Sequence, residues 1–107
     1  MRKRTIKIPI YTGELVIVLD KDLSYVQNKY KTKDLRGYGA VTIKDENKNR
    51  SYVVAFEGVD CGLIAHEVVQ LVNYIFLDCG QELDRVNDEA QAYLTGWLFE
   101  EIYNFIK

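Results

Sequence analysis

The spacing of apolar residues changes at about residue 60, and this change limits the folds that the chain can adopt. Before residue 60, apolar residues alternate with polar ones or form short β-branched runs, which is typical of strands. After it, apolar residues recur every three or four positions, which is typical of amphipathic helices. Strands followed by two long helices predict an α+β fold, in which the helices pack on one face of a small, mostly antiparallel sheet of about four strands.

Four segments of the first half have the composition of strands: 5–11, 14–20, 37–43 and 51–58. A tight turn at Thr12 and Gly13 is expected to join the first two strands. The charged, Asn-rich segment 44–50 is too polar to be buried and is expected to be the loop of a second hairpin. Between the two pairs, apolar residues at helical spacing predict a short helix over 22–31.

The second half predicts two long helices within a single domain that covers residues 1–107. The first helix runs from Asp60 to about Asp78 and stops at Gly80, a residue that commonly ends helices. The second helix is expected to begin at Asn87, which has a good N-cap side chain. One side of this second helix is predicted to be buried, through Leu94, Leu98, Ile102, Phe105 and Ile106.

Charge and cysteine content argue against several classes of partner. The chain has 16 acidic and 14 basic residues, and its one basic cluster, residues 1–4, is expected to be frayed, so we expect no nucleic-acid partner. We see neither a signal peptide nor an apolar span, so we expect no membrane partner. Cys61 and Cys79 are too widely spaced for a metal knuckle and are expected to be reduced, which predicts a cytoplasmic protein.

The first predicted helix contains the motif HEVVQ at residues 66–70. His66 and Gln70 are four residues apart and therefore share one side of the helix, with Glu67 one step around it. In an HExxH zinc site, two histidines hold the metal and the glutamate takes a proton from the metal-bound water. Gln70 stands in the place of the second histidine, and its neutral amide oxygen is a weak zinc donor.

A zinc site of this type needs a third protein ligand. The start of the second predicted helix offers Glu89, which lies 19 residues after Gln70. The small residues Ala92 and Gly96 on the same helix predict a close approach of the two helices. Such an approach would bring Glu89 toward His66.

The stretches IAHEVVQLVNYIF and NDEAQAYLTGWLFE together resemble minimal gluzincin-type zincins of phage and prophage origin, over about residues 50–107. The resemblance implies a zincin-like metallopeptidase in which His66 and Glu89 bind zinc and Glu67 is the general base. Asn73 and Tyr93 would then support the ligands from beside them. Because Gln70 replaces a histidine, we expect zinc to be absent or at low occupancy, and we favour a pseudoenzyme.

Two functions stay open at this point. The first is an active zinc peptidase, in which the strand over 52–57 pairs its edge with an extended peptide substrate. The second is a non-catalytic, protein-binding module in which His66, Gln70 and Glu89 form a hydrogen-bond network without metal. A plain interpretation also remains, in which His66 is a partly exposed helical histidine bonded to Glu67, Glu89 or a backbone carbonyl.

Overall fold

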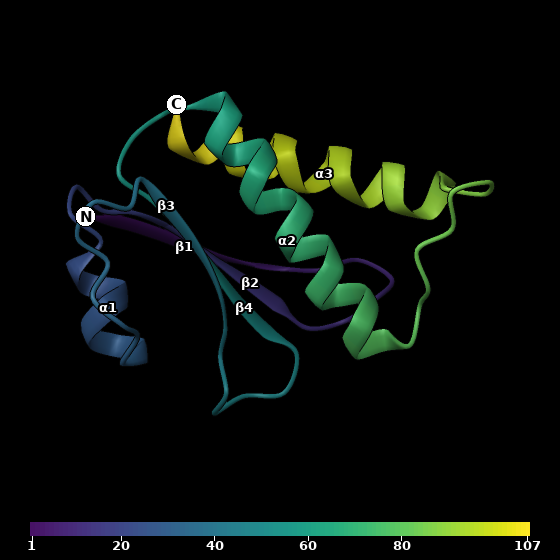
Figure 1. The fold of residues 1–107 in the computed structure, drawn as a ribbon, viewed down its shortest axis with the longest axis horizontal. Helices are drawn as coiled ribbons and strands as arrows, with labels where there is room; N and C mark the ends of the chain where they lie inside the picture. The colour runs from purple at the N-terminus through teal and green to yellow at the C-terminus, as the bar shows by residue number, and fades with distance from the viewer.

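The computed structural model describes residues 1–107 and places the strands before the long helices, which confirms the predicted α+β fold (Figure 1). Its elements are β1 (Arg2–Lys7), β2 (Glu14–Leu19), α1 (Ser24–Tyr30), β3 (Ala40–Lys44), β4 (Ser51–Phe56), α2 (Cys61–Cys79) and α3 (Glu89–Ile106). None of the helices combines the length and the apolar run that a bilayer crossing requires.

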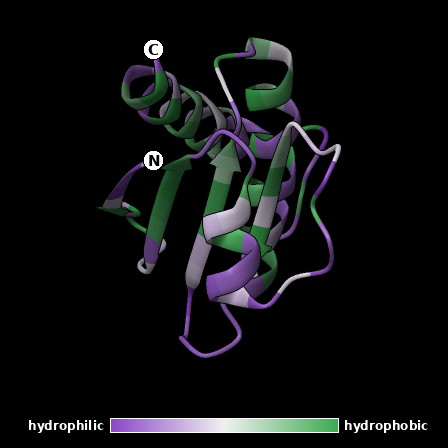
Figure 2. Ribbon diagram, turned by 90° about the vertical axis from the view of Figure 1, so that its left-hand side faces the viewer, coloured by the Kyte–Doolittle hydropathy of each residue, from purple (hydrophilic) through white to green (hydrophobic).

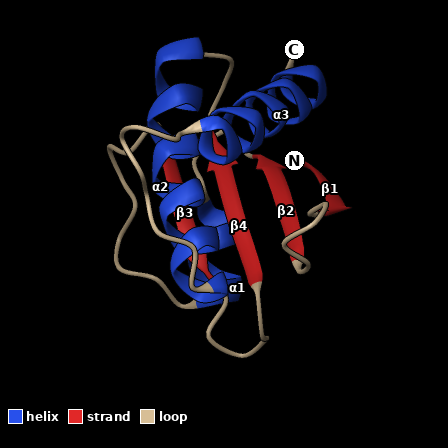
Figure 3. Ribbon diagram, turned by 90° about the vertical axis from the view of Figure 1, so that its right-hand side faces the viewer, coloured by secondary structure: helices blue, strands red, loops and turns tan.

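The four strands form one sheet in the order β1-β2-β4-β3. β1 pairs antiparallel with β2, and β3 pairs antiparallel with β4, while β2 and β4 run parallel in the middle of the sheet. Figure 3 shows β4 between β2 and β3. The expectation that the strand over 52–57 offers a free edge is therefore wrong, because β4 is paired on both sides. The free edges belong to β1 and β3.

The sheet separates two layers of helices. α2 and α3 cover one face, while the short α1 covers part of the other (Figures 1 and 3). Because neighbouring residues of a strand point to opposite faces, Val54 packs in the larger core with α2 and α3, whereas Val53 packs in the smaller core beneath α1. Figure 2 shows that apolar residues gather on the strands and the long helices, and that the loop between β3 and β4 is hydrophilic.

The ends of α2 match the sequence prediction, because the Asp60 side chain accepts from the Leu63 N–H and Gly80 closes the helix with φ of 71°. The start of α3 differs slightly, since Asn87 was expected as the N-cap and the helix begins at Glu89. The Asp84 carboxylate accepts from the backbone N–H groups of Val86 and Asn87. These bonds hold Asn87 in the preceding turn.

Two expectations about the chain termini need correction. The basic N-terminus is not frayed, because β1 begins at Arg2 and pairs with β2 along its whole length. In α3, Leu94, Leu98, Ile102 and Ile106 are buried as predicted, but Phe105 is only partly buried. The guanidinium of Arg2 lies 5.1 Å from the centre of the Phe105 ring and donates to the Ile106 carbonyl, so the two termini are in contact.

Candidate functional site

The predicted motif residues form a small polar cluster between α2 and β3. Glu67 is 5% exposed, and its Oε1 accepts a hydrogen bond of 2.8 Å from Thr42 Oγ1 on β3. A carboxylate loses solvation when it is buried, and a hydroxyl donor restores part of that loss. The Glu67 carboxylate therefore links α2 to β3.

His66 and Gln70 lie on the exposed side of this cluster. The His66 side chain is 64% exposed, and its Nε2 lies 3.8 Å from Glu67 Oε2. Gln70 Nε2 lies 3.3 Å from the same imidazole nitrogen. The amide N–H of Gln70 donates to this nitrogen when the ring carries its proton on Nδ1. The lone pair that would bind a metal at Nε2 is then used by Gln70.

Glu89 lies in another part of the molecule. α3 begins on the side where α2 ends, whereas His66 is in the second turn of α2 (Figure 1). The expected close approach at Gly96 does not occur, because a Cβ added to Gly96 would meet no atom within 4 Å. The helices pack instead through larger residues such as Leu94 and Leu98. Glu89 is exposed and is not gathered with the motif residues.

The arrangement does not fit a three-ligand zinc site. No group of three or more His, Cys, Asp or Glu side chains is gathered closely enough to hold a metal ion. The motif itself supplies one imidazole, one carboxylate bonded to Thr42 and one amide bonded to His66. Zinc sites in proteins usually hold the metal through at least three protein ligands, and the residues around His66 do not provide such a set.

The two residues expected to support the ligands also lie apart. Asn73 is exposed on α2, one turn beyond Gln70. Tyr93 is on α3, where it lines an apolar hollow of about 370 Å³ together with Trp97 and with Ile10 of the β1–β2 connection. Neither side chain forms a hydrogen bond to His66 or Glu67 in the structure. Tyr93 is therefore part of a separate surface.

A second polar cluster fixes the other end of β3 to α2. The Asp78 carboxylate accepts hydrogen bonds of 2.6 Å from Lys44 Nζ and from Tyr52 Oη. Burial alone would raise the pKa of Asp78, but the two bonds, together with the positive charges of Lys44 and Arg50, outweigh burial and hold the pKa below its ordinary value. The bond to Asp78 raises the pKa of Lys44, and burial followed by the Asp78 bond raises the pKa of Tyr52 well above its ordinary value.

β3 presents an open row of backbone groups on its outer side. Gly39 O accepts from Glu57 N, and Asp45 N donates to Ser51 O, so the odd-numbered residues bond to β4. In an antiparallel pair, the residues between these point their N–H and C=O groups away from the partner. The outward groups belong to Ala40, Thr42 and Lys44, and no other segment bonds to them.

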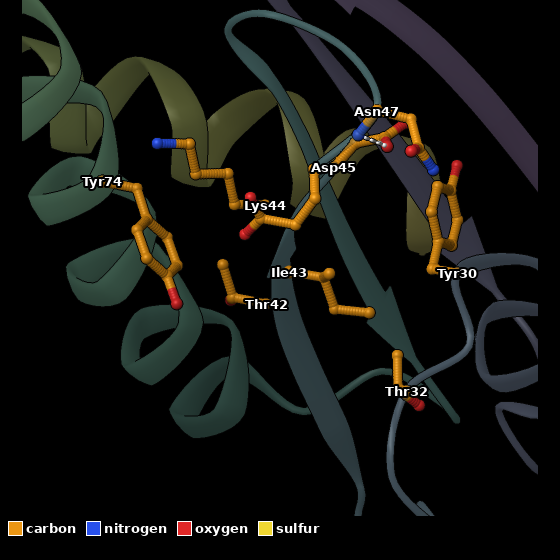
Figure 4. A pocket seen from close by; sticks show the side chains of 9 residues that line it. Tyr30, Thr32, Thr42, Ile43, Lys44, Asp45, Asn47 and Tyr74 are labelled. Carbon is orange, nitrogen blue, oxygen red and sulfur yellow. Dashed lines mark hydrogen bonds between the residues drawn. The ribbon is translucent and has the colours of Figure 1, made fainter.

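A trough of about 340 Å³ runs along this strand (Figure 4). Tyr74 of α2 stands on one side of β3, and Tyr30 and Thr32 stand on the other side. Figure 4 shows the Thr42 side chain on the side of Tyr74 and the Ile43 side chain on the side of Thr32. The open edge therefore lies at the floor of a groove with one aromatic residue on each wall.

Sequence reasoning missed this edge, although a signal was present. Every residue of β4 is buried, and its continuous apolar run is typical of a central strand. β3 alternates apolar and polar residues and is only half-buried, which is typical of an edge. Comparing the two patterns would have favoured β3 over β4 as the open strand.

Comparisons with known proteins do not add to this site. No protein-family model, curated protein or solved structure matches the chain. Function is therefore inferred from the residues and the geometry described above. The features that bear on it are the polar cluster at His66 and the open edge of β3.

Proposed function

We propose that this chain is a non-catalytic peptide-binding protein, a degenerate zincin-like protein of phage type that binds an extended peptide along β3. The observation that carries the proposal is the open edge of β3, which lies in a groove beside the polar cluster of α2. Strand addition at such an edge takes its affinity from main-chain hydrogen bonds and its specificity from alternate side chains.

The hydrogen bonds within the cluster support a non-catalytic role. The Glu67 carboxylate accepts from Thr42, and Gln70 Nε2 lies 3.3 Å from His66 Nε2, so each of the three motif side chains contacts another polar side chain of the protein. In an HExxH site the glutamate acts on a metal-bound water, and the motif of this chain supplies only one histidine, His66, to hold such a metal. The cluster instead keeps α2 against the strand that forms the floor of the groove.

The groove suits a peptide in the extended conformation. The outward N–H and C=O groups of Ala40, Thr42 and Lys44 repeat every second residue, which is the spacing of a partner strand. Alternate peptide side chains would then contact Tyr74 on the α2 side and Tyr30 on the α1 side. Aromatic residues supply large contact areas at low entropic cost.

The test is a selection of linear nonapeptides displayed on phage, followed by anisotropy measurements on the enriched sequences. Thr42→Pro removes an outward N–H of β3, and Thr42→Val removes the bond to Glu67 while keeping that N–H. We expect Thr42→Pro to bind at least ten-fold more weakly than Thr42→Val. Thr5→Pro is the matched control, because Ile8 N donates to Gly13 O, which places the Thr5 N–H on the outer side of β1.

Amide hydrogen exchange of the wild-type protein provides a second test, which does not depend on whether Thr42→Pro folds. In wild-type protein, amide exchange at Thr42 and Lys44 is expected to be fast without peptide and slow with the selected peptide. Exchange at Val41 and Ile43 is expected to be slow in both states. Equal protection of both sets in the free protein, or no enriched peptide above the empty-surface control, contradicts the proposal.

The competing function, an active zinc peptidase, is tested by metal analysis of wild type beside Gln70→His. We expect no stoichiometric zinc in wild type and no rise in melting temperature with excess zinc, because a ligand of the native state must stabilise it. One equivalent of zinc in wild type, together with chelator-sensitive peptide hydrolysis, would overturn the non-catalytic assignment. Zinc in Gln70→His alone would indicate a site that lacks only that ligand.

A further inference from the structure

Charge is distributed unevenly along the chain. Residues 1–38 contain nine Lys and Arg and four Asp and Glu, a net charge of +5, whereas residues 39–107 contain five and twelve, a net charge of −7. The first set includes β1 and α1, and the second includes both long helices. The overall charge of −2 is therefore the sum of a basic N-terminal part, which includes α1, and an acidic C-terminal part, which includes α2 and α3.

Most of the positive charge near α1 has no carboxylate partner. Only three Lys or Arg side chains in the structure form ion pairs with a carboxylate: Arg36, Lys44 and Lys48. The cations around α1 that form none include Lys3, Lys29, Lys31 and Lys33.

Glu14 and Asp45 line a hollow together with Lys3, Lys29 and Tyr30. The nearby acids already have partners, because Asp34 and Glu14 are paired with Arg36 and Lys48. The other three cap backbone N–H groups, namely Asp20 at Tyr25, Asp22 at Ser24 and Asp45 at Asn47.

Tyrosine rings lie between these lysines. Lys3 Nζ of β1 and Lys29 Nζ of α1 both donate to the Tyr25 hydroxyl, at 2.8 and 3.2 Å, and they lie 5.1 and 5.6 Å from the centre of its ring. Lys33 Nζ lies 5.0 Å from the ring of Tyr38, which is 40% exposed. Lys29 also lies 5.7 Å from the ring of Tyr30. Lys29 thus contacts both Tyr25 and Tyr30 on α1, and Lys3 of β1 meets it at Tyr25, while Lys33 and Tyr38 form a second pair in the connection between α1 and β3. These six residues are called the lysine–tyrosine surface.

We propose that the lysine–tyrosine surface binds single-stranded nucleic acid. Lysine ammonium groups neutralise backbone phosphates, and tyrosine rings provide planes on which unpaired bases stack. The proposal reverses the expectation of no nucleic-acid partner, which was based on net charge and on the one basic cluster at residues 1–4. Tyr30 also lines the groove at β3, whereas Lys29, Lys33 and Tyr38 do not, so variants of these three residues test this surface separately from peptide binding.

The composition of the surface favours a single strand over a duplex or a bilayer. A duplex keeps its bases stacked on each other, so it leaves the tyrosine rings without partners. Membrane-surface helices insert bulky apolar side chains beneath the headgroups. The exposed large apolar residues of this protein lie elsewhere, apart from Tyr38, so α1 has no such anchor.

The test uses fluorescein-labelled dT15 and anisotropy at 50 and 200 mM NaCl. We expect log affinity to fall with log salt with a slope of about −2 to −3, since each neutralised phosphate of a single strand contributes about −0.7. Lys29→Ala/Lys33→Ala should bind about ten-fold more weakly and reduce the slope by about 1.4. Tyr38→Ala should weaken binding about ten-fold, because stacking on one base is lost.

The matched control is Arg85→Ala/Lys107→Ala, which removes the same charge from outside the surface and should change affinity less than two-fold. Circular dichroism checks that each variant is folded. Absence of binding to dT15 at 50 mM NaCl overturns the proposal, as does an equal loss in the control. Tighter binding to a DNA duplex or to phosphatidylserine vesicles, with no effect of Tyr38→Ala, assigns the surface to another polyanion and also overturns it.

Discussion

The two edge strands of the sheet are built in opposite ways. Four of the six residues of β1 are Lys or Arg, and none of its side chains is fully buried. β3 has one cation, Lys44, which is neutralised by Asp78, and its remaining residues are buried or half-buried. The hollow that Lys3 and Thr5 of β1 line is smaller, about 200 Å³, and most of its lining residues are polar.

This difference indicates which edge can accept another strand. Repeated positive charges on an edge strand repel a second copy of the same edge and disfavour sheet extension. β3 carries no such protection, and two polar clusters hold it to α2 at Thr42 and Lys44. Because β3 is held in place and its one cation is neutralised by Asp78, its outward backbone groups are already in position for pairing. Strand addition is therefore expected at β3 and disfavoured at β1.

The largest difference in stability is expected between a variant of Asp78, which holds β3 in place, and a variant of Lys7 on β1. Asp78→Ala leaves the buried Tyr52 hydroxyl and Lys44 without a partner, which should lower the free energy of unfolding by about 3 kcal/mol. Lys7→Ala on β1 should change it by less than about 0.5 kcal/mol. Urea denaturation of both variants measures the contrast. Similar losses in the two variants would show that β3 is not held more firmly than β1.

The pH dependence of the free energy of unfolding gives a second measure of how Asp78 holds β3. The pKa of Asp78 is lower in the folded state than in the unfolded state, so the ionised carboxylate stabilises the fold. This stabilisation is fully present above the pKa of the unfolded state, and it is lost as the pH falls through the pKa of the folded state. At pH 7, Asp78→Asn should be less stable than wild type by about 2 kcal/mol, because two charge-assisted bonds weaken. The gap should close below about pH 4. A gap that stays constant down to pH 2 would contradict this role of Asp78.

A smaller difference is expected at the two threonines of the edges. Thr42→Val removes the bond to the buried Glu67 and should cost about 1 kcal/mol of unfolding free energy. Thr5→Val on β1 breaks no hydrogen bond and places a good strand former on an exposed position, so it should be neutral or slightly stabilising. Thermal denaturation of the pair checks the prediction, and equal effects would argue against the Thr42–Glu67 bond.

The smallest effect is expected at Gln70, although its identity raised the question of metal binding. Gln70 and His66 are both exposed, so cutting their contact in Gln70→Ala should change the free energy of unfolding by less than about 0.5 kcal/mol. Chemical denaturation measures the change. A loss above about 1 kcal/mol would mean that the contact is shielded from water and belongs to the β3 anchor.

Part of the fold followed from local sequence patterns. The change from alternating to helical spacing located the elements apart from β1, which was expected over 5–11 and lies at Arg2–Lys7. Asp60 and Gly80 marked the ends of α2 because capping depends on neighbouring residues. The candidate site was predicted less well. His66, Glu67 and Gln70 are together because helical spacing fixes them, whereas the placement of Glu89 depended on how α3 crosses α2. The spacing within one helix carries no information about that crossing.

The sequence by itself determined which segments are strands and helices, where α2 begins and ends, and which motif residues share one side of it. Only the tertiary structure decided that β4 is central and β3 is an edge, because strand order is set by the parallel pairing of β2 with β4 over a long separation. It also decided that Glu67 bonds to Thr42, and that Lys3 meets Tyr25. These contacts join residues far apart in the chain, and local periodicity does not specify them.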